Sequence, residues 1–343
     1  MKIGLVGYAG SGKSTAFELL TGIKPDPAKV HSGQVGVAVL PDKRFDRLVE
    51  LYHPKKTTPT RIELFDTPGL NRSQQEGNAQ KLGVIREAMA LVHVIGQFAG
   101  ADPVADAEAF FDDIVLADLQ VVSNRVEKLR KDSTKPRPDR DELKAELEAL
   151  QPIVDQLEAG HALLDFEFSE LQEQVCRSFS LLSRKHQLLV LNTADSAVDD
   201  EVVATLRGRG HAVVSAPIGL ELEVQSLPPD EREEFGREMG LEGSSRDNLL
   251  QAIFSVTNQL TFYTCDEKEV HGWLLTKGST AIEAAHSIHS DLARGFIRAE
   301  VVATEDLLRL GSEREVKAAG LHHVEGKDYV VRDGDEIVIR FSV

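Results

Sequence analysis

Short runs of consecutive apolar residues recur along most of the chain and are separated by polar, helix-forming stretches. Runs of this length are typical of strands that are buried on both faces of a parallel sheet. Their alternation with helical segments predicts a doubly wound α/β domain. The strands are expected at residues 3–6, 35–40, 61–65, 90–95, 187–191 and 212–214, with a closing helix at 246–258.

The hydrophobic period changes in the middle of the chain, between residues 112 and 186. In two stretches the apolar residues are spaced alternately four and three apart: Val115, Leu119, Val122, Val126 and Leu129, then Leu143, Leu147, Leu150, Val154 and Leu157. This spacing is the seam of a coiled coil. The proline-bearing break at residues 133–138 predicts that the two helices form an antiparallel hairpin. Ser169 and Gln172 have the spacing of a capping box, which predicts the start of a shorter helix.

The residues after 258 have the pattern of a compact mixed unit. A single helix is expected at residues 281–292. The strands of this unit are expected at residues 261–264, 270–275, 297–303, 329–331 and 336–341.

Residues 7–14, Gly-Tyr-Ala-Gly-Ser-Gly-Lys-Ser, match the phosphate-binding loop pattern G-x-x-x-x-G-K-[ST] at every fixed position. The motif stands between an expected strand and an expected helix, which is the context it requires. Its glycines allow successive backbone N–H groups to converge on a polyphosphate, and the helix start adds its positive end. Lys13 is expected beside the β- and γ-phosphates, and the Ser14 hydroxyl on Mg²⁺. The nucleotide-binding residues predicted in this loop are Gly10, Ser11, Gly12, Lys13, Ser14 and Thr15.

The stretch Asp66-Thr67-Pro68-Gly69 follows an expected strand and has the form of the second nucleotide switch. Asp66 is predicted to hold Mg²⁺ through water, and the Gly69 N–H to sense the γ-phosphate. Lys13 and Gly69 are therefore the expected catalytic residues. The next residue is Leu70, where Ras-like proteins have a glutamine that orients the attacking water. Because an apolar side chain cannot do this, hydrolysis is expected to be slow or to use another group.

The first switch segment, before the strand expected at residues 35–40, is polar and turn-rich. A threonine hydroxyl from this segment normally reaches Mg²⁺, and the nearby hydroxyl here is Ser32. Two interpretations stay open at this point: Ser32 is a further metal ligand or an ordinary loop serine.

The stretch Asn192-Thr193-Ala194-Asp195 follows another expected strand and partly matches the guanine-binding pattern N-K-x-D. In that pattern the aspartate accepts hydrogen bonds from guanine, and the asparagine ties its loop to the phosphate loop. The lysine that would cover the base is Thr193 here. Ser215 and Ala216 end the next expected strand, where a short base-side loop is usual. Base contacts are predicted at these residues, and a plain turn is the alternative.

The composition limits the possible partners and compartment. A net charge of −17 over 343 residues argues against wrapping nucleic acid through general basicity, but allows a local basic patch. The two cysteines, Cys176 and Cys265, lie far apart, which fits a reducing compartment. No signal-peptide pattern is visible, and no run approaches the roughly 18 apolar residues of a membrane span. A cytoplasmic protein without a membrane partner is expected.

Three histidines have sequence positions that suggest chemistry. His93 lies inside an expected buried strand and is predicted to be a packed core residue rather than a catalytic one. His286 and His289 have the i, i+3 spacing of metal ligands. No carboxylate or cysteine with matching spacing accompanies them, so a structural or solvent-facing role is expected.

The order of the motifs resembles the YchF branch of the Obg-related translation-factor NTPases, the Obg-like ATPases. In this order, a P-loop precedes D-T-P-G-L, and a helical hairpin precedes N-x-x-D and S-A. The stretches R-G-F-I-R-A-E-V at residues 294–301 and E-G-K-D-Y at 325–329 are also similar to that branch. The resemblance covers nearly the whole chain.

The resemblance implies three domains and a partner. Residues 1–111 and 187–258 would form a Ras-like P-loop NTPase domain, 112–186 an inserted coiled-coil domain, and 259–343 a β-grasp (TGS) domain. It further implies slow hydrolysis, with an apolar residue such as Leu70 as a family trait. The ribosome or ribosomal RNA is the implied partner, through the coiled-coil and TGS domains.

Four features depart from the family's pattern. The loop is Y-A-G-S-G-K-S-T where the family usually has P-N-V-G-K-S-T, and the D-x-x-G motif carries Thr67-Pro68, nearer to Obg itself. The other two departures concern single residues. Val30 aligns with the threonine of the first switch, so an apolar side chain replaces the one that normally contacts Mg²⁺. Asp195 stands where the family tends to have Glu, a feature linked there to ATP. The two oxygens of this shorter carboxylate match the paired donors of guanine, which predicts a modest preference for GTP over ATP.

The residues and the resemblance together predict a P-loop NTPase switch that binds GTP or ATP with Mg²⁺ and slowly hydrolyses the β–γ bond. The alternative is a ribosome- or RNA-binding module whose nucleotide site has only a structural role. The altered first switch favours that alternative, and the intact G-K-S-T opposes it. A small-molecule kinase ranks last, because no stretch identifies a second substrate site.

Overall fold

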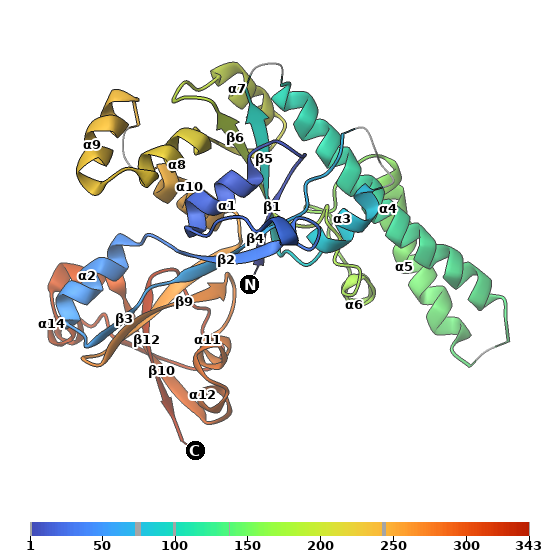
Figure 1. Cartoon of the computed structure of the whole chain (residues 1–343). Coiled ribbons are helices and arrows are strands. Elements are labelled where there is room, and N and C mark those ends of the chain that lie inside the picture. The colour runs from blue at the N-terminus through green and yellow to red at the C-terminus, as the bar shows by residue number, and fades with distance from the viewer. Residues whose placement is uncertain (1, 73–76, 99–100, 137, 242–244, 343) are drawn as a thin grey trace. The chain divides into compact units, whose positions relative to one another are not determined.

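The computed structural model of the chain describes residues 2–72, 77–98, 101–136, 138–241 and 245–342 (Figure 1). Its contacts divide the chain into two compact units. The first contains residues 1–36 and 63–249, and the second contains residues 37–62 and 250–343. Neither unit is therefore one continuous segment.

The first sheet contains the six strands predicted for the α/β domain. They are β1 Lys2–Val6, β2 Gln34–Val39, β4 Arg61–Asp66, β5 Ala90–Gln97, β6 Gln187–Thr193 and β7 Ala212–Ala216, in the order β2-β4-β1-β5-β6-β7. Strand β1 pairs in parallel with β4 and with β5, and β5, β6 and β7 continue the parallel order. The carboxyl ends of these parallel strands meet at one edge, which is where such sheets bind ligands.

The apolar runs form these strands because both faces of the sheet's centre are covered. Every residue of β5 except Gln97 is buried, and so is every residue of β6 except Gln187. The helix α1, Lys13–Thr21, covers part of the sheet with its buried side chains Ala16, Phe17, Leu19 and Leu20. A 3₁₀ helix spans Pro27–Lys29. The other short helices of this region are α3 Asn78–Ile85, α7 Asp200–Gly208, α8 Ile218–Ser226, α9 Pro229–Glu238 and α10 Ser245–Ser255.

Two long helices follow β5 and lie side by side (Figure 1). They are α4 Pro103–Ser133 and α5 Arg140–Glu158. The predicted seam residues of both helices lie in or against one apolar cluster, together with Cys176. Of the predicted break between them, residue 137 lies outside the described residues. The predicted capping box opens α6 Glu170–Cys176, where the Ser169 N–H donates to Gln172 Oε1 at 2.8 Å.

The second unit is built on a six-stranded mixed sheet. Its strands are β3 Lys56–Thr58, β8 Gln259–Cys265, β9 Glu269–Thr276, β10 Phe296–Ala303, β11 His323–Glu325 and β12 Asp335–Phe341, in the order β11-β10-β12-β8-β9-β3. Its helices are α2 Lys43–Tyr52, α11 Ala281–Ile288, α12 Ser290–Arg294, α13 Thr304–Leu310 and α14 Glu313–Ala318. The apolar side chains of this unit fill two clusters. Of the neighbouring β8 residues, Phe262 belongs to one cluster and Tyr263 belongs to the other.

Two sequence predictions in this unit were wrong in detail. The single helix expected at 281–292 is two helices, because His289 has extended backbone angles and caps α12 with its side chain. The strand expected at 329–331 is reduced to one isolated bridge between Val330 and Thr280. Its neighbour Tyr329 instead donates a 2.9 Å hydrogen bond to Asp335.

Residues 37–62 pack with the C-terminal residues through α2 and β3. Phe45 and Leu48 of α2 lie in the same cluster as Tyr263. The Arg44 guanidinium forms a 2.7 Å ion pair with Asp333, and the Tyr52 hydroxyl donates a 2.8 Å hydrogen bond to Glu336. The compact units thus group this segment differently from the domain boundaries drawn on the sequence.

Among the helices that the structure describes, none is both long and apolar enough to pass through a lipid bilayer.

Candidate nucleotide-binding site

The predicted phosphate loop joins β1 to α1 in the expected geometry. Gly10 and Gly12 have φ angles of 84° and 98°, a region that side-chain-bearing residues rarely adopt. Gly12 is the residue before α1, and its carbonyl accepts the Ala16 N–H at 2.8 Å. The loop therefore ends at a helix N-terminus whose first N–H groups are available to an anion.

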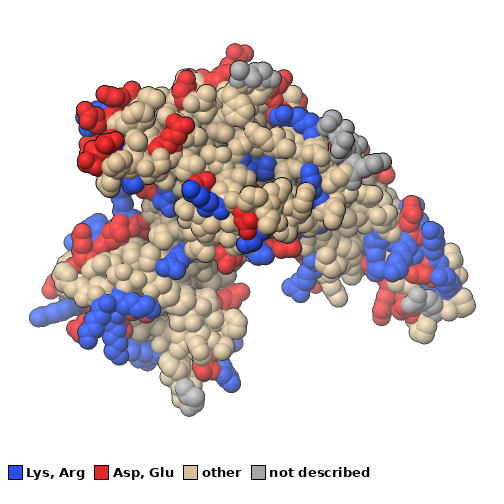
Figure 2. All heavy atoms as spheres, in the orientation of Figure 1, with Lys and Arg blue, Asp and Glu red and all other residues tan. Residues whose placement is uncertain are grey.

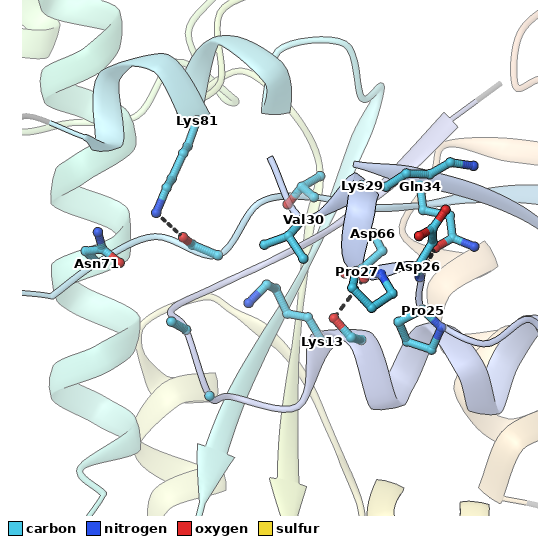
Figure 3. A pocket seen from close by; sticks show the side chains of 15 residues that line it. Lys13, Pro25, Asp26, Pro27, Lys29, Val30, Gln34, Asp66, Asn71 and Lys81 are labelled. Carbon is cyan, nitrogen blue, oxygen red and sulfur yellow. Dashed lines mark hydrogen bonds between the residues drawn. The ribbon is translucent and has the colours of Figure 1, made fainter. Parts of the chain in front are cut away.

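The loop opens onto a cavity of about 480 Å³ (Figure 3). Of the predicted loop residues, Gly10, Lys13 and Ser14 line it, whereas Ser11, Gly12 and Thr15 are not among its lining residues. The second switch contributes Asp66, Thr67 and Gly69, so the structure brings the two halves of the predicted phosphate site together.

Ser14 and Asp66 are in direct contact in this cavity. The Ser14 hydroxyl donates to Asp66 Oδ2 at 2.8 Å. The other carboxylate oxygen, Oδ1, is buried and has no hydrogen-bond partner within the described part of the chain. Burial raises the pKa of Asp66, while the Ser14 hydrogen bond and the Lys13 charge lower it. A hydroxyl beside a carboxylate with an unpaired oxygen is a donor set that suits Mg²⁺.

Lys13 is the buried cation of the cavity. Its side chain is only 6% exposed, and its ammonium group donates a 2.9 Å hydrogen bond to the carbonyl oxygen of Tyr8. Burial lowers the pKa of Lys13 to about 8, with Asp66 opposing the shift and Lys81 adding to it. An anion beside this ammonium group would stabilise its charge, as the loop's predicted role requires.

The second switch is attached to the phosphate loop by backbone hydrogen bonds. The Leu70 N–H donates to the Gly7 carbonyl at 3.1 Å, and the Ala9 N–H donates to the Leu70 carbonyl at 2.9 Å. A methyl group at Gly69 would lie 3.0 Å from Lys13 Nζ and 3.2 Å from the Ala9 Cα, so the switch backbone passes close to both. Gly69 is thus placed beside the lysine that is predicted to hold the γ-phosphate.

Leu70 points away from the cavity and into the core. Its side chain is fully buried, in a cluster with Tyr8 of the loop and Phe110 and Ile114 of α4. The structure therefore gives a physical reason why this position cannot orient a water molecule. Leu70 instead packs the second switch segment against the helix α4.

The first switch segment forms the opposite wall without a hydroxyl group. Val30 lines the cavity and is 59% exposed, whereas Ser32 is not among the described residues that line it. Asp26, which does line it, uses one carboxylate oxygen to cap the short helix Pro27–Lys29 through the Ala28 N–H. The structure thus favours the ordinary loop serine over a metal ligand at Ser32.

Lys81 and Asn71 line the same cavity and were missed on the sequence. Lys81 comes from α3, and its ammonium group donates a 2.6 Å hydrogen bond to the Gly69 carbonyl (Figure 3). No motif connects this lysine with the switch, because it stands twelve positions after Gly69. In the sequence, the one signal that Lys81 could line the cavity is its place among apolar residues in the helix after the switch.

The base-side residues occupy a second, smaller region of the same sheet edge. The Asn192 side-chain amide donates a 3.0 Å hydrogen bond to the Ser11 carbonyl, which is the tie predicted for it. Thr193 and Ser215 line a cavity of about 250 Å³ with Ser196. The Ser215 hydroxyl is buried and lacks a hydrogen-bond partner among the described residues.

Asp195 and Ala216 take other positions. Asp195 is exposed and is not among the residues described as lining the smaller cavity. Its Oδ1 accepts the Ala197 N–H at 2.9 Å, and its backbone carbonyl accepts the Thr193 hydroxyl. Ala216 is buried at the end of β7. The loop therefore has an internal turn, and the structure alone does not bring the Asp195 carboxylate to the base cavity.

Two family models match the chain. One, described as "50S ribosome-binding GTPase", matches residues 2–125. The other, named YchF-GTPase_C and described as "Protein of unknown function (DUF933)", matches residues 260–342.

Whole-chain relatives decide the family. The chain is 35% identical to the "Ribosome-binding ATPase YchF" of Bacillus subtilis, with 99% of each chain covered. It is 32% identical to the protein of the same name from Escherichia coli O157:H7, over 100% of this chain and 99% of the relative. The chain belongs to the YchF family.

A solved YchF structure shares the fold. The chain is similar to the "Structure of the Schizosaccharomyces pombe YchF GTPase" with a TM-score of 0.83 and 23% identity, covering 99% of this chain and 97% of the other. The α/β P-loop architecture predicted from the sequence is thereby confirmed, and so is the resemblance to the YchF family.

Two of the histidines singled out in the sequence, His93 and His289, have structural contacts, and His286 is exposed. His93 is 1% exposed and stacks on Phe110 with ring centroids 4.0 Å apart. Burial lowers the pKa of His93 to about 3, with the Lys13 charge adding to the shift, so its imidazole is neutral at physiological pH. His289 caps α12. No group of three or more His, Cys, Asp and Glu side chains among the described residues could hold a metal ion.

Proposed function

We propose that this YchF-family chain is a P-loop nucleoside triphosphatase that binds GTP or ATP with Mg²⁺ and hydrolyses the β–γ phosphate bond slowly. One observation carries the proposal. Ser14 and Asp66 meet at 2.8 Å in the cavity that Lys13 and Gly69 also line. These four residues come from two distant segments, and together they match the parts that phosphoryl transfer needs.

The chain's own residues bind and orient the triphosphate. The loop amides and Lys13 receive the β- and γ-phosphates, and Lys13 exchanges its hydrogen bond to the Tyr8 carbonyl for phosphate oxygens. The Gly69 N–H contacts the γ-phosphate and couples its presence to the second switch. Ser14 and Asp66 would hold Mg²⁺, which when bound neutralises phosphate charge.

Slow hydrolysis follows from the position of Leu70. Its buried side chain leaves the site without the water-orienting group of Ras-like proteins. This same observation favours a second candidate function, a nucleotide-dependent binding module that does not hydrolyse. The two differ in one measurable quantity, which is phosphate release from bound triphosphate in a single turnover.

The ribosome is the proposed partner, because the relatives cited above are named ribosome-binding. We assign residues 112–186 to a coiled-coil domain and residues 259–343 to a TGS domain as the contacting parts. One feature of the second unit supports a nucleic-acid contact. Figure 2 shows Lys and Arg side chains gathered at lower left, over β3 and the start of β9.

Two segments meet in this basic patch. The Lys56 N–H donates to the Lys268 carbonyl at 3.0 Å, so Lys55, Lys56 and Lys268 lie close together and exposed, with the Lys56 ammonium group in a 2.9 Å ion pair with Glu269. Adjacent exposed lysines attract phosphate groups even on a chain of net negative charge.

The test of the proposed function uses Lys13→Ala and a matched control, Lys24→Ala. Lys24 is exposed and is not among the described residues that line the main cavity. Titration of labelled Mg-GTP and Mg-ATP should show that Lys13→Ala loses nucleotide binding and that Lys24→Ala keeps the wild-type affinity. The circular dichroism spectra of both variants should match that of the wild type. Wild-type turnover by Lys13→Ala would contradict the proposal.

The partner is tested separately by sedimentation with purified ribosomes. We expect Lys56→Glu combined with Lys268→Glu to reduce co-sedimentation without changing nucleotide affinity. Equal sedimentation of this variant and the wild type would exclude the basic patch as the contact.

A further inference from the structure

Lys81 gives the phosphate cavity a second ammonium group from outside the P-loop. Its Nζ donates to the Gly69 carbonyl at 2.6 Å, and its side chain lines the cavity with Lys13. Figure 3 shows Lys81 reaching from α3 toward the switch backbone, while Lys13 extends from α1.

The position of Lys81 is fixed by a two-way amide contact. The Asn71 N–H donates to Asn78 Oδ1, and Asn78 Nδ2 donates to the Asn71 carbonyl, both at 2.9 Å. Asn78 is the first residue of α3 and is buried. Lys81 is three residues later, almost one helical turn on, so the contact that holds α3 also aims Lys81 at the switch.

The peptide group between Gly69 and Leu70 is held at both ends. Its carbonyl accepts Lys81, and its N–H donates to Gly7 at 3.1 Å. With Leu70 buried in the core, Lys81 brings a cation to the part of the cavity that Gly69 also lines. This cation comes from α3, and not from the phosphate loop or the switch segment.

We propose that Lys81 supplies positive charge for phosphoryl transfer. Its ammonium group moves from the Gly69 carbonyl to the γ-phosphoryl oxygens as the β–γ bond breaks. The inference rests on the proposed function and adds a catalytic residue from α3. It assigns to the chain's own lysine the charge stabilisation that other NTPases take from an arginine finger.

The chemistry balances without a change in the protonation of Lys81. The water oxygen forms a bond to the γ-phosphorus, and the bond from that phosphorus to the bridging oxygen breaks. The nucleoside diphosphate leaves with the bridging electron pair, and the proton lost by water passes to the inorganic phosphate formed. Lys81 stays an ammonium ion and stabilises negative charge on the transferred group.

A structural role for Lys81 would instead consist of holding the Gly69 carbonyl. The two roles can be separated because a glutamine can donate to that carbonyl but carries no charge. Lys81→Gln should therefore behave like the wild type if the hydrogen bond matters, and like Lys81→Met if the charge matters. Lys81→Arg keeps a charge and should recover part of the rate.

The experiment measures single-turnover phosphate release from saturating Mg-GTP and Mg-ATP, together with the affinity for labelled diphosphate. For Lys81→Met and Lys81→Gln, we expect the rate to fall roughly 100-fold. We expect the diphosphate affinity to stay within about twofold, because the interaction is made only during phosphoryl transfer. Binding of aluminium fluoride to the diphosphate complex should be lost in both variants. Lys24→Met is the matched control and should retain the wild-type rate.

Three results would overturn the inference. Wild-type rates in Lys81→Met or in Lys81→Gln would show that the charge is not used. An equal loss of rate and of diphosphate affinity would show a general binding role. If the wild-type chain binds nucleotide but releases no phosphate, both the hydrolysis and the role of Lys81 are excluded. If the wild type hydrolyses and the Lys81 variants do likewise, only the inference about Lys81 fails.

Discussion

The Asn192 side chain donates a 3.0 Å hydrogen bond to the carbonyl oxygen of Ser11, which joins the end of β6 to the phosphate loop. Asn192 is 7% exposed, and a methyl group on Gly12 would collide with its Nδ2. One amide group therefore joins the end of β6 to the loop between β1 and α1.

We expect Asn192→Ala to weaken the affinity for GTP and ATP by about 1–2 kcal/mol, because it leaves the Ser11 carbonyl without its donor. Titration of labelled nucleotide measures this change, and Asn248→Ala, an exposed position on α10, is the control. Gly12→Ala should abolish binding, and adding Asn192→Ala should relieve only the collision, since the backbone strain at Gly12 remains. Unchanged affinity in Asn192→Ala would show that the tie has no role in the bound state.

Replacing Leu70 with glutamine should not create fast hydrolysis. The fully buried Leu70 side chain lies in one apolar cluster with Tyr8 and Phe110, so a glutamine there would bury an amide group without a ready partner. We expect Leu70→Gln to lower the free energy of unfolding by about 1–3 kcal/mol, measured by urea denaturation, while phosphate release does not increase.

Leu70→Met keeps the apolar volume and is the control for that variant. A large rise in the hydrolysis rate of Leu70→Gln, with stability retained, would mean that the side chain can turn out of the core and that only a water-orienting group was missing.

The choice of base is expected to depend on Asp195 through a rearrangement of its loop. Asp195 now accepts the Ala197 N–H, and a guanine with two parallel donors can compete for its carboxylate. We predict a modest preference for GTP over ATP, by roughly threefold to tenfold. Asp195→Ala should remove this preference without changing the affinity for ATP. Competition of unlabelled GTP and ATP against labelled GTP measures it.

Ser215→Ala tests whether the Ser215 hydroxyl also contacts the base, because this hydroxyl is buried and has no hydrogen-bond partner among the described residues. If ATP displaces the label as well as GTP does in the wild type, and Asp195→Ala leaves that ranking unchanged, Asp195 does not read the base.

The stability of the chain should depend on pH through Glu336. Glu336 is 5% exposed, and burial raises its pKa from 4.5 to about 7; Glu313 adds to the shift, and the Tyr52 hydrogen bond opposes it. Between those two pKa values the folded state keeps a proton that the unfolded state releases. The free energy of unfolding therefore falls as pH rises from about 4.5 to 7, and the loss is complete above the folded pKa.

Glu336→Gln removes this ionisation and keeps a partner for Tyr52. We expect the variant to be more stable than the wild type at pH 8 by up to about 3 kcal/mol, with little difference at pH 5. Thermal or urea unfolding across this range measures the effect, and the exposed Glu267→Gln is the control. A pH dependence as steep in Glu336→Gln as in the wild type would contradict the assignment.

The strands of the first sheet and the helical pair could be predicted because their signals are local. Continuous apolar runs have few alternatives to buried strands, and the four-three spacing of residues such as Val122 and Leu150 can be satisfied only by a facing helix. The phosphate loop was predictable for the same reason, since Gly12 and Lys13 stand at fixed offsets in one segment. The Ser14–Asp66 contact then follows from a parallel sheet edge.

The remaining features depend on which distant surfaces meet. Phe45 and Leu48 identify α2 as amphipathic, but nothing in their spacing says that they cover the C-terminal sheet. Strand β3 is three residues long and carries no buried side chain, so it has no hydrophobic signal. The role proposed for Lys81 could not be predicted for the same reason, because it depends on the contact between Asn71 and Asn78, which links α3 to the segment after Gly69.

The membership of residues 37–62 in the C-terminal unit has a consequence for biosynthesis. A ribosome makes Arg44 289 residues before its ion-pair partner Asp333. Until β8, β9 and β10 have been translated, Phe45 and Leu48 lack most of the cluster that they join, and β3 has no strand to pair with before β9 is made. The nascent chain therefore carries an unburied amphipathic helix through most of its elongation. Exposed apolar surface of this kind is where chaperones bind and where aggregation starts.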